Sequence, residues 1–184
     1  MTRESLIAQW LADEAAQKAR QVGGPGPGVA RPEQLAGLDG LQTMQAMMNG
    51  ELPYAEIAQT LNFMLVEIER GRAVFQGEPL AAHLNPLGTV HGGWFATLLD
   101  SALGCAVHSM MPVGRAYTTA ELGINLVRAI HPARVSRVRA EDQVQHCGRQ
   151  LATATARLVG PDGTLYAHAS TTCLVFEIPS QSRA

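Results

Sequence analysis

The sequence predicts an α+β protein in which an antiparallel sheet curls around one long helix. Two observations lead to this fold class. Residues 93–110 are nearly all apolar or small. As a helix they would have apolar side chains on most sides instead of in one stripe. Two short segments before this helix and four longer ones after it alternate as strands do. A helix that is apolar on most sides needs a wide surface around it, which a curled sheet provides.

An N-terminal extension, residues 1–61, precedes the predicted sheet and is expected to be helical. Residues 5–21 have apolar side chains at helical spacing among charges, which predicts an amphipathic helix. The Gly- and Pro-rich segment 23–28 breaks this helix and predicts a linker. A second helix is expected at 38–48 and a short helical turn at 54–61.

The strands of the predicted sheet follow the extension. They are expected at 63–68, 73–76, 117–130, 134–146, 150–159 and 164–176. Polar turns at 69–72 and 160–163 indicate tight connections between the first two and the last two strands. The last two strands are rich in Ala and Thr, whose small side chains let a helix approach closely. The sheet domain is expected to span 62–178, with a frayed tail at 179–184.

The long helix contains a single carboxylate, Asp100, among its apolar residues. An ionised carboxylate in such a place costs several kcal/mol unless it is paired or hydrogen-bonded. Asp100 is therefore a candidate for chemistry. The structural alternative is that Asp100 lies at a subunit seam or touches solvent, bonded to Thr97 or Ser101, without a chemical role.

The turn before the helix contains the pair Gly92 and Gly93. At a helix N-terminus their N–H groups are unpaired and not shielded by a Cβ, and the helix dipole is positive there. A polarised carbonyl oxygen suits this place, while a plain glycine turn is the alternative. Asp100 lies about two turns farther along, roughly 12 Å at 1.5 Å per residue. One chain therefore cannot easily bring both groups to the same carbonyl.

The composition argues against several classes of protein. The 184 residues, 46% of them hydrophobic, suffice for one domain with a sizeable core. A formal net charge of -2 gives no indication of a nucleic-acid or anionic-membrane partner. The three cysteines are far apart and the histidines lack ligand spacing, so neither a disulfide framework nor a metal site is expected. Without a membrane-spanning stretch or a signal-peptide core, the sequence predicts a cytoplasmic location.

Four short motifs stand out along the chain. They are N-P-L-G-T-V-H-G-G at 85–93, L-L-D-S-A at 98–102, T-A-E-L-G-I-N at 119–125 and H-C-G-R at 146–149. Together they resemble the PaaI-type hot-dog acyl-CoA thioesterases, over about residues 62–176. The resemblance implies a hot-dog fold and a homodimer, or a dimer of dimers, with each active site between two chains. Asp100 of one chain can then face Gly92 of the other.

The resemblance also implies a reaction and its catalytic residues. The reaction is hydrolysis of an acyl-CoA thioester to the free acid and coenzyme A, with no cofactor besides the coenzyme A of the substrate. The Gly92 N–H polarises the thioester carbonyl, and Asp100 acts as nucleophile or as general base for water. Asn85 orients substrate or water, and Thr119 supplies a hydroxyl that positions the water. His91 supports the loop or touches the thioester, with acid or base catalysis as the alternative.

The substrate-binding residues implied by the resemblance are Gly93, beside the catalytic glycine, and Gly148 with Arg149, which meet the nucleotide of coenzyme A. The chain departs from the family after its third strand, where R-A-I-H-P at 128–132 replaces the usual Arg-Pro. Glu121 and Asn125 lie on the same strand as Thr119, which leaves open a second acidic contributor. The acyl group is not indicated by the sequence.

Two other functions compete with hydrolysis. A non-catalytic acyl-CoA sensor would keep the pocket and recruit a partner through the N-terminal extension, but it would gain nothing from a buried carboxylate. A hot-dog enoyl-CoA hydratase uses the motif Asp-x-Asn-Pro-x-His, whereas this chain reads H-L-N-P-L-G at 83–88. Both catalytic groups of that motif are missing, which disfavours the hydratase.

Overall fold

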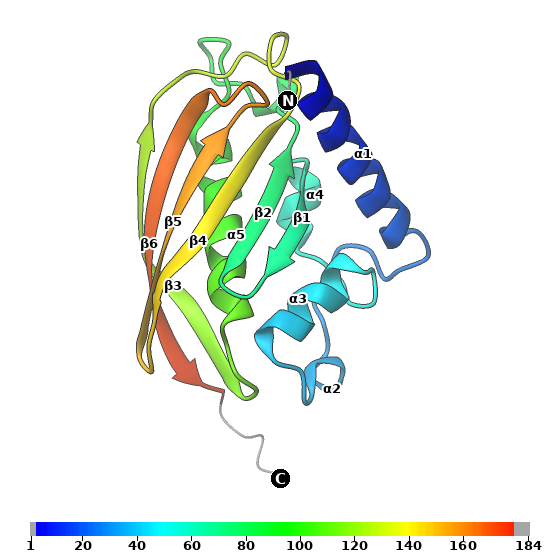
Figure 1. The fold of residues 1–184 in the computed structure, drawn as a ribbon, viewed down its shortest axis with the longest axis vertical. Helices are drawn as coiled ribbons and strands as arrows, with labels where there is room; N and C mark the ends of the chain where they lie inside the picture. Colours follow the sequence, from blue (N-terminus) through cyan, green and yellow to red (C-terminus); the bar gives the residue numbers. More distant parts are fainter. Residues whose placement is uncertain (1–2, 179–184) are drawn as a thin grey trace.

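The computed structural model describes residues 3–178, in which a six-stranded sheet surrounds one long helix (Figure 1). All neighbouring strands are antiparallel, in the order β1-β2-β4-β5-β6-β3. The strands are β1 (Phe63–Glu69), β2 (Arg72–Gly77), β3 (Arg115–Leu126), β4 (Val138–Cys147), β5 (Leu151–Val159) and β6 (Leu165–Glu177). The predicted fold class is confirmed.

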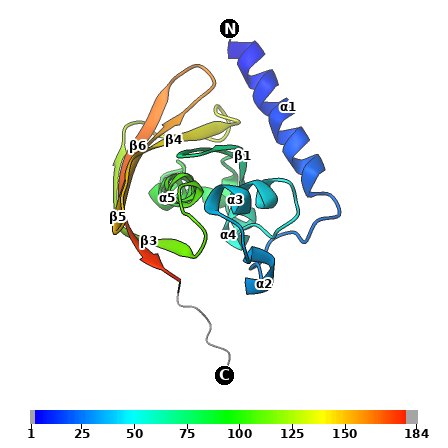
Figure 2. The same ribbon diagram turned by 60° about the horizontal axis from the view of Figure 1, so that its bottom comes forward.

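The helices lie mainly on the concave side of the sheet. They are α1 (Arg3–Gln21), α2 (Pro32–Leu35), α3 (Gly40–Met48), α4 (Glu56–Thr60) and α5 (Gly92–Ser109), with a short 3-10 turn η1 (Ala81–His83). Figure 2 shows the sheet curved around α5, with α3 and α4 beside α5 and α1 farther out. Helix α5 thus has the sheet on one side and α3 on another.

The core lies between α5 and the inner face of the sheet. Six apolar α5 residues are completely buried: Leu98, Leu99, Ala102, Leu103, Ala106 and Val107. The strand residues that face them on β5 and β6 are mostly alanines: Ala152, Ala154, Ala156, Ala167 and Ala169. These small side chains let α5 approach the sheet closely, as the sequence predicted. Burial of each leucine side chain contributes about 1.5–3 kcal/mol.

The predicted end of the third strand, at residue 130, and the predicted start of the fourth strand, at residue 134, are both wrong. β3 ends at Leu126 and β4 begins at Val138, so residues 127–137 form a loop. The N–H groups of Val127 and Arg128 both donate to the carbonyl of Tyr166 instead of continuing the strand pairing. Pro132 cannot donate to a strand ladder, which favours a loop here.

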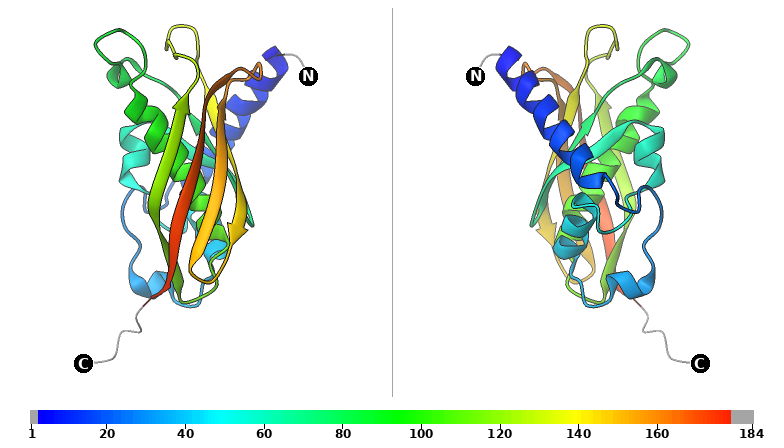
Figure 3. Two further views of the ribbon diagram at one scale, coloured as in Figure 1. Left: turned by 90° about the vertical axis from the view of Figure 1, so that its left-hand side faces the viewer. Right: turned by 90° about the vertical axis from the view of Figure 1, so that its right-hand side faces the viewer.

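The two edges of the sheet differ. β1 is short and lies beside α1, α3 and α4. β3 is 12 residues long and packs against β6 and α5. The left view of Figure 3 shows β3 at the free edge, and within the described residues no strand pairs with its outer side.

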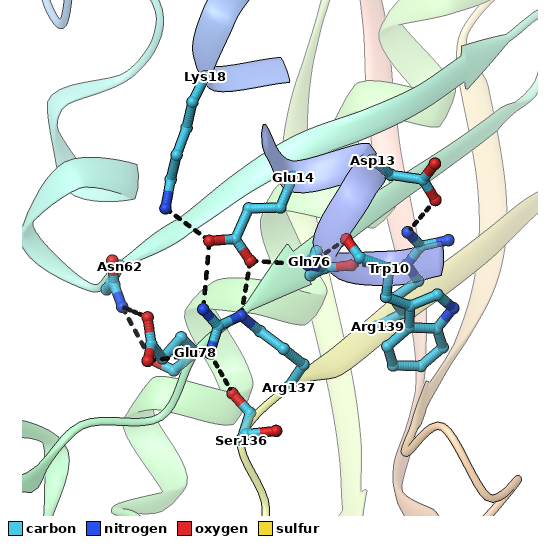
Figure 4. A network of polar contacts seen from close by, with 10 residues as sticks. All are labelled: Trp10, Asp13, Glu14, Lys18, Asn62, Gln76, Glu78, Ser136, Arg137 and Arg139. Atoms are coloured by element: carbon cyan, nitrogen blue, oxygen red, sulfur yellow. Dashed lines mark hydrogen bonds and ion pairs between the residues drawn. The ribbon is translucent and has the colours of Figure 1, made fainter. Parts of the chain in front are cut away.

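A polar network fixes α1 to the outer face of the sheet (Figure 4; the right view of Figure 3 shows α1 crossing the strands). Glu14 accepts hydrogen bonds from Arg137 Nε at 2.6 Å and from Gln76 Nε2 at 2.9 Å. Arg139 lies 4.6 Å from the ring centroid of Trp10 and donates to Gln76 Oε1 at 2.9 Å. Burial opposes ionisation of Glu14, but the hydrogen bonds from Arg137, Lys18 and Gln76 outweigh it and lower its pKa to about 2.

The predicted linker at 23–28 joins α1 to the rest of the extension. Gly28 N–H donates to the Tyr54 carbonyl at 2.9 Å, and Tyr54 N–H donates to the Gly26 carbonyl at 3.2 Å. Part of this segment is therefore attached to the chain before β1. The domain boundary between residues 61 and 62 stays a prediction, and the tail expected at 179–184 lies outside the described residues.

A buried carboxyl group, Asp142, lies between β4 and α5. It follows the core residues Val138 and Ala140 at a spacing of two along β4. The three side chains therefore share the face that points toward the helix. Asp142 is only 4% exposed; its Oδ1 accepts a 3.4 Å hydrogen bond from Ala73 N–H, and its Oδ2 has no hydrogen-bond partner in the described part of the chain. Burial raises the pKa of Asp142 to about 8. The folded chain therefore holds this carboxyl protonated at neutral pH.

Asp142→Asn is expected to stabilise the protein more at pH 8 than at pH 4. The unfolded carboxyl ionises near its ordinary pKa of 3.8, whereas the folded one keeps its proton up to about pH 8, so wild-type stability falls as pH rises through this window. The amide does not titrate. Thermal unfolding of both proteins at the two pH values tests this, because any packing cost of the amide is the same at both. An equal Tm difference at pH 4 and pH 8 would refute the assignment.

Candidate functional site

The turn before α5 is organised by the Asn85 side chain. Its Oδ1 accepts hydrogen bonds from the N–H groups of Leu87 at 2.9 Å and Thr89 at 3.2 Å. Its Nδ2 donates to Thr89 Oγ1 at 2.9 Å. Since an amide nitrogen carries two hydrogens, one remains for a ligand. Asn85 thus shapes the turn that leads into the helix and keeps a donor available.

The first N–H groups of α5 differ in availability. His91 is the N-cap, and its Nδ1 accepts a hydrogen bond from Gly93 N–H at 2.9 Å. Gly92 is the first helical residue, and its N–H has no acceptor within residues 3–178. The N–H expected from the sequence to activate the carbonyl is therefore the free one. His91 thus caps the helix through Gly93, and its predicted role at the site stays a prediction.

A groove of about 250 Å³ lies beside this helix start. It is lined by Asn85, Thr89, Val90, Gly92, Phe95, Leu126, Val127, Arg128 and Ala129. The groove combines the free Gly92 N–H with the apolar side chains of Phe95 and Leu126. Sequence reasoning did not connect Leu126 with Gly92, because the contact depends on where β3 ends against the helix.

Asp100 lies farther along α5, on the side that faces β3. It is half-buried, and its Oδ1 accepts a hydrogen bond from Thr119 Oγ1 at 3.2 Å. The expected partners Thr97 and Ser101 bond elsewhere: Thr97 Oγ1 donates to the Gly93 carbonyl and Ser101 Oγ to the Thr97 carbonyl. Hydroxyls within helices commonly bond in this way to the preceding turn. The structure therefore brings Asp100 and Thr119 together.

A β-bulge in β3 makes the contact between Asp100 and Thr119. The pairing of β3 with β6 skips Ala120. Counting back from Leu122, which packs in the core, strict alternation would turn Thr119 to the outer face. Thr119 is in phase with Tyr117, which also packs in the core, and the extra residue at the bulge lets Thr119 and Leu122 both face inward while Glu121 is on the outer face. Glu121, the possible second acidic contributor, is thus directed away from Asp100.

Gly148 and Arg149 lie in the turn between β4 and β5, far from Gly92 of the same chain. The Arg149 carbonyl accepts a hydrogen bond from Arg115, the first residue of β3. Gly92 approaches Leu126, the last residue of β3. The strand between them is roughly 40 Å long at about 3.4 Å per residue. Within one chain, the predicted nucleotide contacts and the carbonyl activator are therefore at opposite ends.

Two further findings concern the described residues as a whole. Within 3–178, no three His, Cys, Asp or Glu side chains come together in a group that could hold a metal ion. None of the helices in this range combines the length and apolar character needed to cross a membrane.

Comparisons with known proteins agree with the fold. Residues 87–167 match the family model of the thioesterase superfamily. A phenylacetic acid degradation-related protein from Ralstonia eutropha is 26% identical, with 71% of this chain and 97% of that chain covered and a TM-score of 0.64. A mutant of the phenylacetic acid degradation protein PaaI from Thermus thermophilus is 26% identical, with 65% and 97% covered and a TM-score of 0.58.

A thioesterase family protein from Silicibacter pomeroyi is 27% identical, with 66% of this chain and 89% of that chain covered and a TM-score of 0.60. No curated protein sequence matches the chain. The fold and the family match together support the predicted resemblance to hot-dog thioesterases. The similarity to two phenylacetic acid degradation proteins confirms the predicted resemblance to thioesterases of the PaaI type.

His91→Ala is expected to lower the free energy of unfolding by about 1 kcal/mol, the usual cost of losing an N-cap acceptor. His91→Asn should recover most of this loss, because asparagine is itself a favourable N-cap residue. Urea unfolding of the three proteins measures both effects. Equal stability of His91→Ala and the wild type would show that the contact with Gly93 N–H does not hold the helix start.

Proposed function

We propose that this chain hydrolyses an acyl-CoA thioester to the free acid and coenzyme A, in sites formed between two chains. The observation that carries the proposal is the unpaired Gly92 N–H at the start of α5, directly beside an apolar groove. A thioester needs an activator for its carbonyl oxygen and an apolar place for its acyl chain. The coenzyme A part of the substrate is supported by the motifs shared with PaaI-type enzymes.

In the proposed mechanism the thioester oxygen accepts a hydrogen bond from Gly92 N–H. As the carbonyl carbon becomes tetrahedral, negative charge grows on this oxygen, and the N–H and the helix dipole stabilise it. One such donor is typically worth about 10²–10³ in rate. The carbon–sulfur bond then breaks, and coenzyme A leaves as the thiolate and takes up a proton.

Asp100 supplies the attacking group in one of two ways. As a general base, its carboxylate removes a proton from water while the water oxygen attacks the carbonyl carbon. As a nucleophile, the carboxylate itself attacks, and water later hydrolyses the resulting anhydride. In both versions the Thr119 hydroxyl, which donates to Asp100 Oδ1, holds the carboxylate in place and lies close enough to position the water.

Two chains are needed because Gly92 and Asp100 lie about two turns apart on α5, roughly 12 Å. The free edge of β3 is the natural place for a second chain, since an unpaired strand edge is a template for pairing. Antiparallel pairing of two β3 strands would reverse one α5 relative to the other. It would bring Asp100 of one chain toward Gly92 of the other, and Arg149 of one chain toward the groove of the other.

The competing function is an acyl-CoA sensor that binds without turnover. The hydrogen-bonded pair of Asp100 and Thr119 favours the enzyme, because binding an acyl chain requires neither group. Release of free thiol from a panel of acyl-CoA substrates separates the two functions. Release of many equivalents of thiol per chain supports the enzyme, whereas binding of acyl-CoA without thiol release supports the sensor.

Asp100→Asn is expected to keep the fold and to lower kcat by about 10²–10⁴, because the amide has the same shape but no basicity. Thiol release measures kcat, and circular dichroism with thermal unfolding checks the fold. Glu121→Gln is the matched control, since its side chain faces the outer side of the same strand as Thr119. Turnover of Asp100→Asn within a few-fold of wild type would disprove the mechanism.

Mixing two inactive variants is expected to restore activity if sites are shared. Asp100→Asn removes the carboxylate, and Gly92→Pro removes the activating N–H at a helix position that tolerates proline. In a mixed dimer one site collects both lesions and the other collects none. Subunit exchange, followed by native mass spectrometry, should therefore bring back thiol release. Confirmed mixed dimers without activity, or an active monomer, would contradict the shared site.

A further inference from the structure

The hydroxyl of Thr171 on β6 reaches the bulge in β3. Thr171 is only 2% exposed, and its Oγ1 donates a hydrogen bond to the Glu121 carbonyl at 2.7 Å. The same hydroxyl lies 3.8 Å from Cys173 Sγ. The Glu121 carbonyl belongs to the residue directly after Ala120, which the pairing skips. Thr171 therefore binds the backbone where the regular ladder of β3 is interrupted.

The residues around Thr171 show that packing alone does not require a hydroxyl there. The other helix-facing residues of β6 are Ala167, Ala169, Cys173 and Val175, all of them buried in the core. Valine would fill nearly the same volume as threonine without placing a polar group in this layer. A buried hydroxyl in such a layer needs a partner, and the carbonyl at the bulge is that partner.

We propose that Thr171 is a positioning residue for the reaction, and this inference rests on the proposed function. Its hydrogen bond holds the bulge at Ala120, and the bulge lets Thr119 face Asp100 while Leu122 stays in the core. Because side chains alternate along a strand, a one-residue change of register would turn Thr119 to the outer face. Thr171 touches neither Asp100 nor the groove at Gly92, so it acts through the backbone of β3.

This arrangement predicts an effect on kcat rather than on substrate binding. Asp100 and Gly92 are both on α5, which packs on β2, β4 and β5 as well as on β3. The groove at Gly92 is lined without residues of the bulge. Loss of the Thr171 hydrogen bond should therefore leave the substrate bound and its carbonyl activated, while Thr119 no longer holds Asp100 or the water.

The experiment compares Thr171→Val with Thr171→Ser and Thr172→Val in the full chain. Thr171→Val removes the hydroxyl at nearly constant volume and should lower kcat by about 10-fold to 100-fold, with KM within about two-fold, since small misplacements cost rates of this size. Thr171→Ser keeps the hydroxyl and should retain most of kcat. Thr172→Val, on the outer face of the same strand, should behave as wild type.

A double mutant tests whether Thr171 acts through Thr119. If it does, Thr119→Val with Thr171→Val should be no slower than Thr119→Val alone, because the second change removes support for a hydroxyl already absent. Losses that multiply would overturn the inference, as would a normal kcat in Thr171→Val or an equal loss in Thr171→Ser. If Thr171→Val does not fold, Thr171→Ala carries the same comparison.

The controls separate this inference from the proposed function. A wild type without thiol release would refute the proposed function, and an active Asp100→Asn would refute its mechanism. With both of these as expected, an unchanged kcat in Thr171→Val refutes only the role of Thr171. Amide hydrogen exchange at Ala120 and Glu121 gives a readout independent of turnover, and it should become faster in Thr171→Val but not in Thr172→Val.

Discussion

The enclosure of helix α5 is the constraint on which the rest of the structure depends. A helix that is apolar on most sides must be covered, and the sheet curls around one side of it while α3 packs on another. The alanines of β5 and β6 make the close approach possible. Once α5 is fixed in this way, its N-terminus opens onto the groove, and the side that carries Asp100 faces β3, the free edge strand.

This enclosure separates the groups that could act on a substrate. The free N–H is at the beginning of α5, the carboxylate lies two turns later, and Arg149 lies at the far end of the sheet. No bending of a packed helix could bring them together within one chain. The open edge of β3 offers a physical solution. A second chain paired there in antiparallel register would place its Asp100 near Gly92 of the first chain.

The central helix and the sheet around it could be predicted because they depend on local patterns. The apolar run of α5 and the alternating strands leave clear periodicities in the sequence. The ends of β3 and β4 were not predicted correctly, because the loop at 127–137 is held by Tyr166 from a distant strand. The bulge at Ala120 could not be predicted for a similar reason, because it exists only in the pairing with β6. Alternation along β3 cannot place both Thr119 and Leu122 on the inner face.

The features missed at the site are likewise long-range. The sequence indicated that Gly92 and Gly93 begin a helix, but only the His91 contact shows that one N–H is used and the other is free. The network between α1 and the outer face of the sheet joins residues more than 60 positions apart, such as Glu14 and Gln76. Such contacts follow from tertiary packing and leave no periodic signal in the sequence.

The most direct test of the shared site is a crystal structure with a ketone analogue of an acyl-CoA, in which a methylene group replaces the thioester sulfur. We expect the carbonyl oxygen to lie about 3 Å from Gly92 N of one chain, within hydrogen-bond distance. The nearest carboxylate to the carbonyl carbon should be Asp100 of the other chain. A carbonyl away from Gly92, or one approached by Gly92 and Asp100 of the same chain, would contradict the shared site.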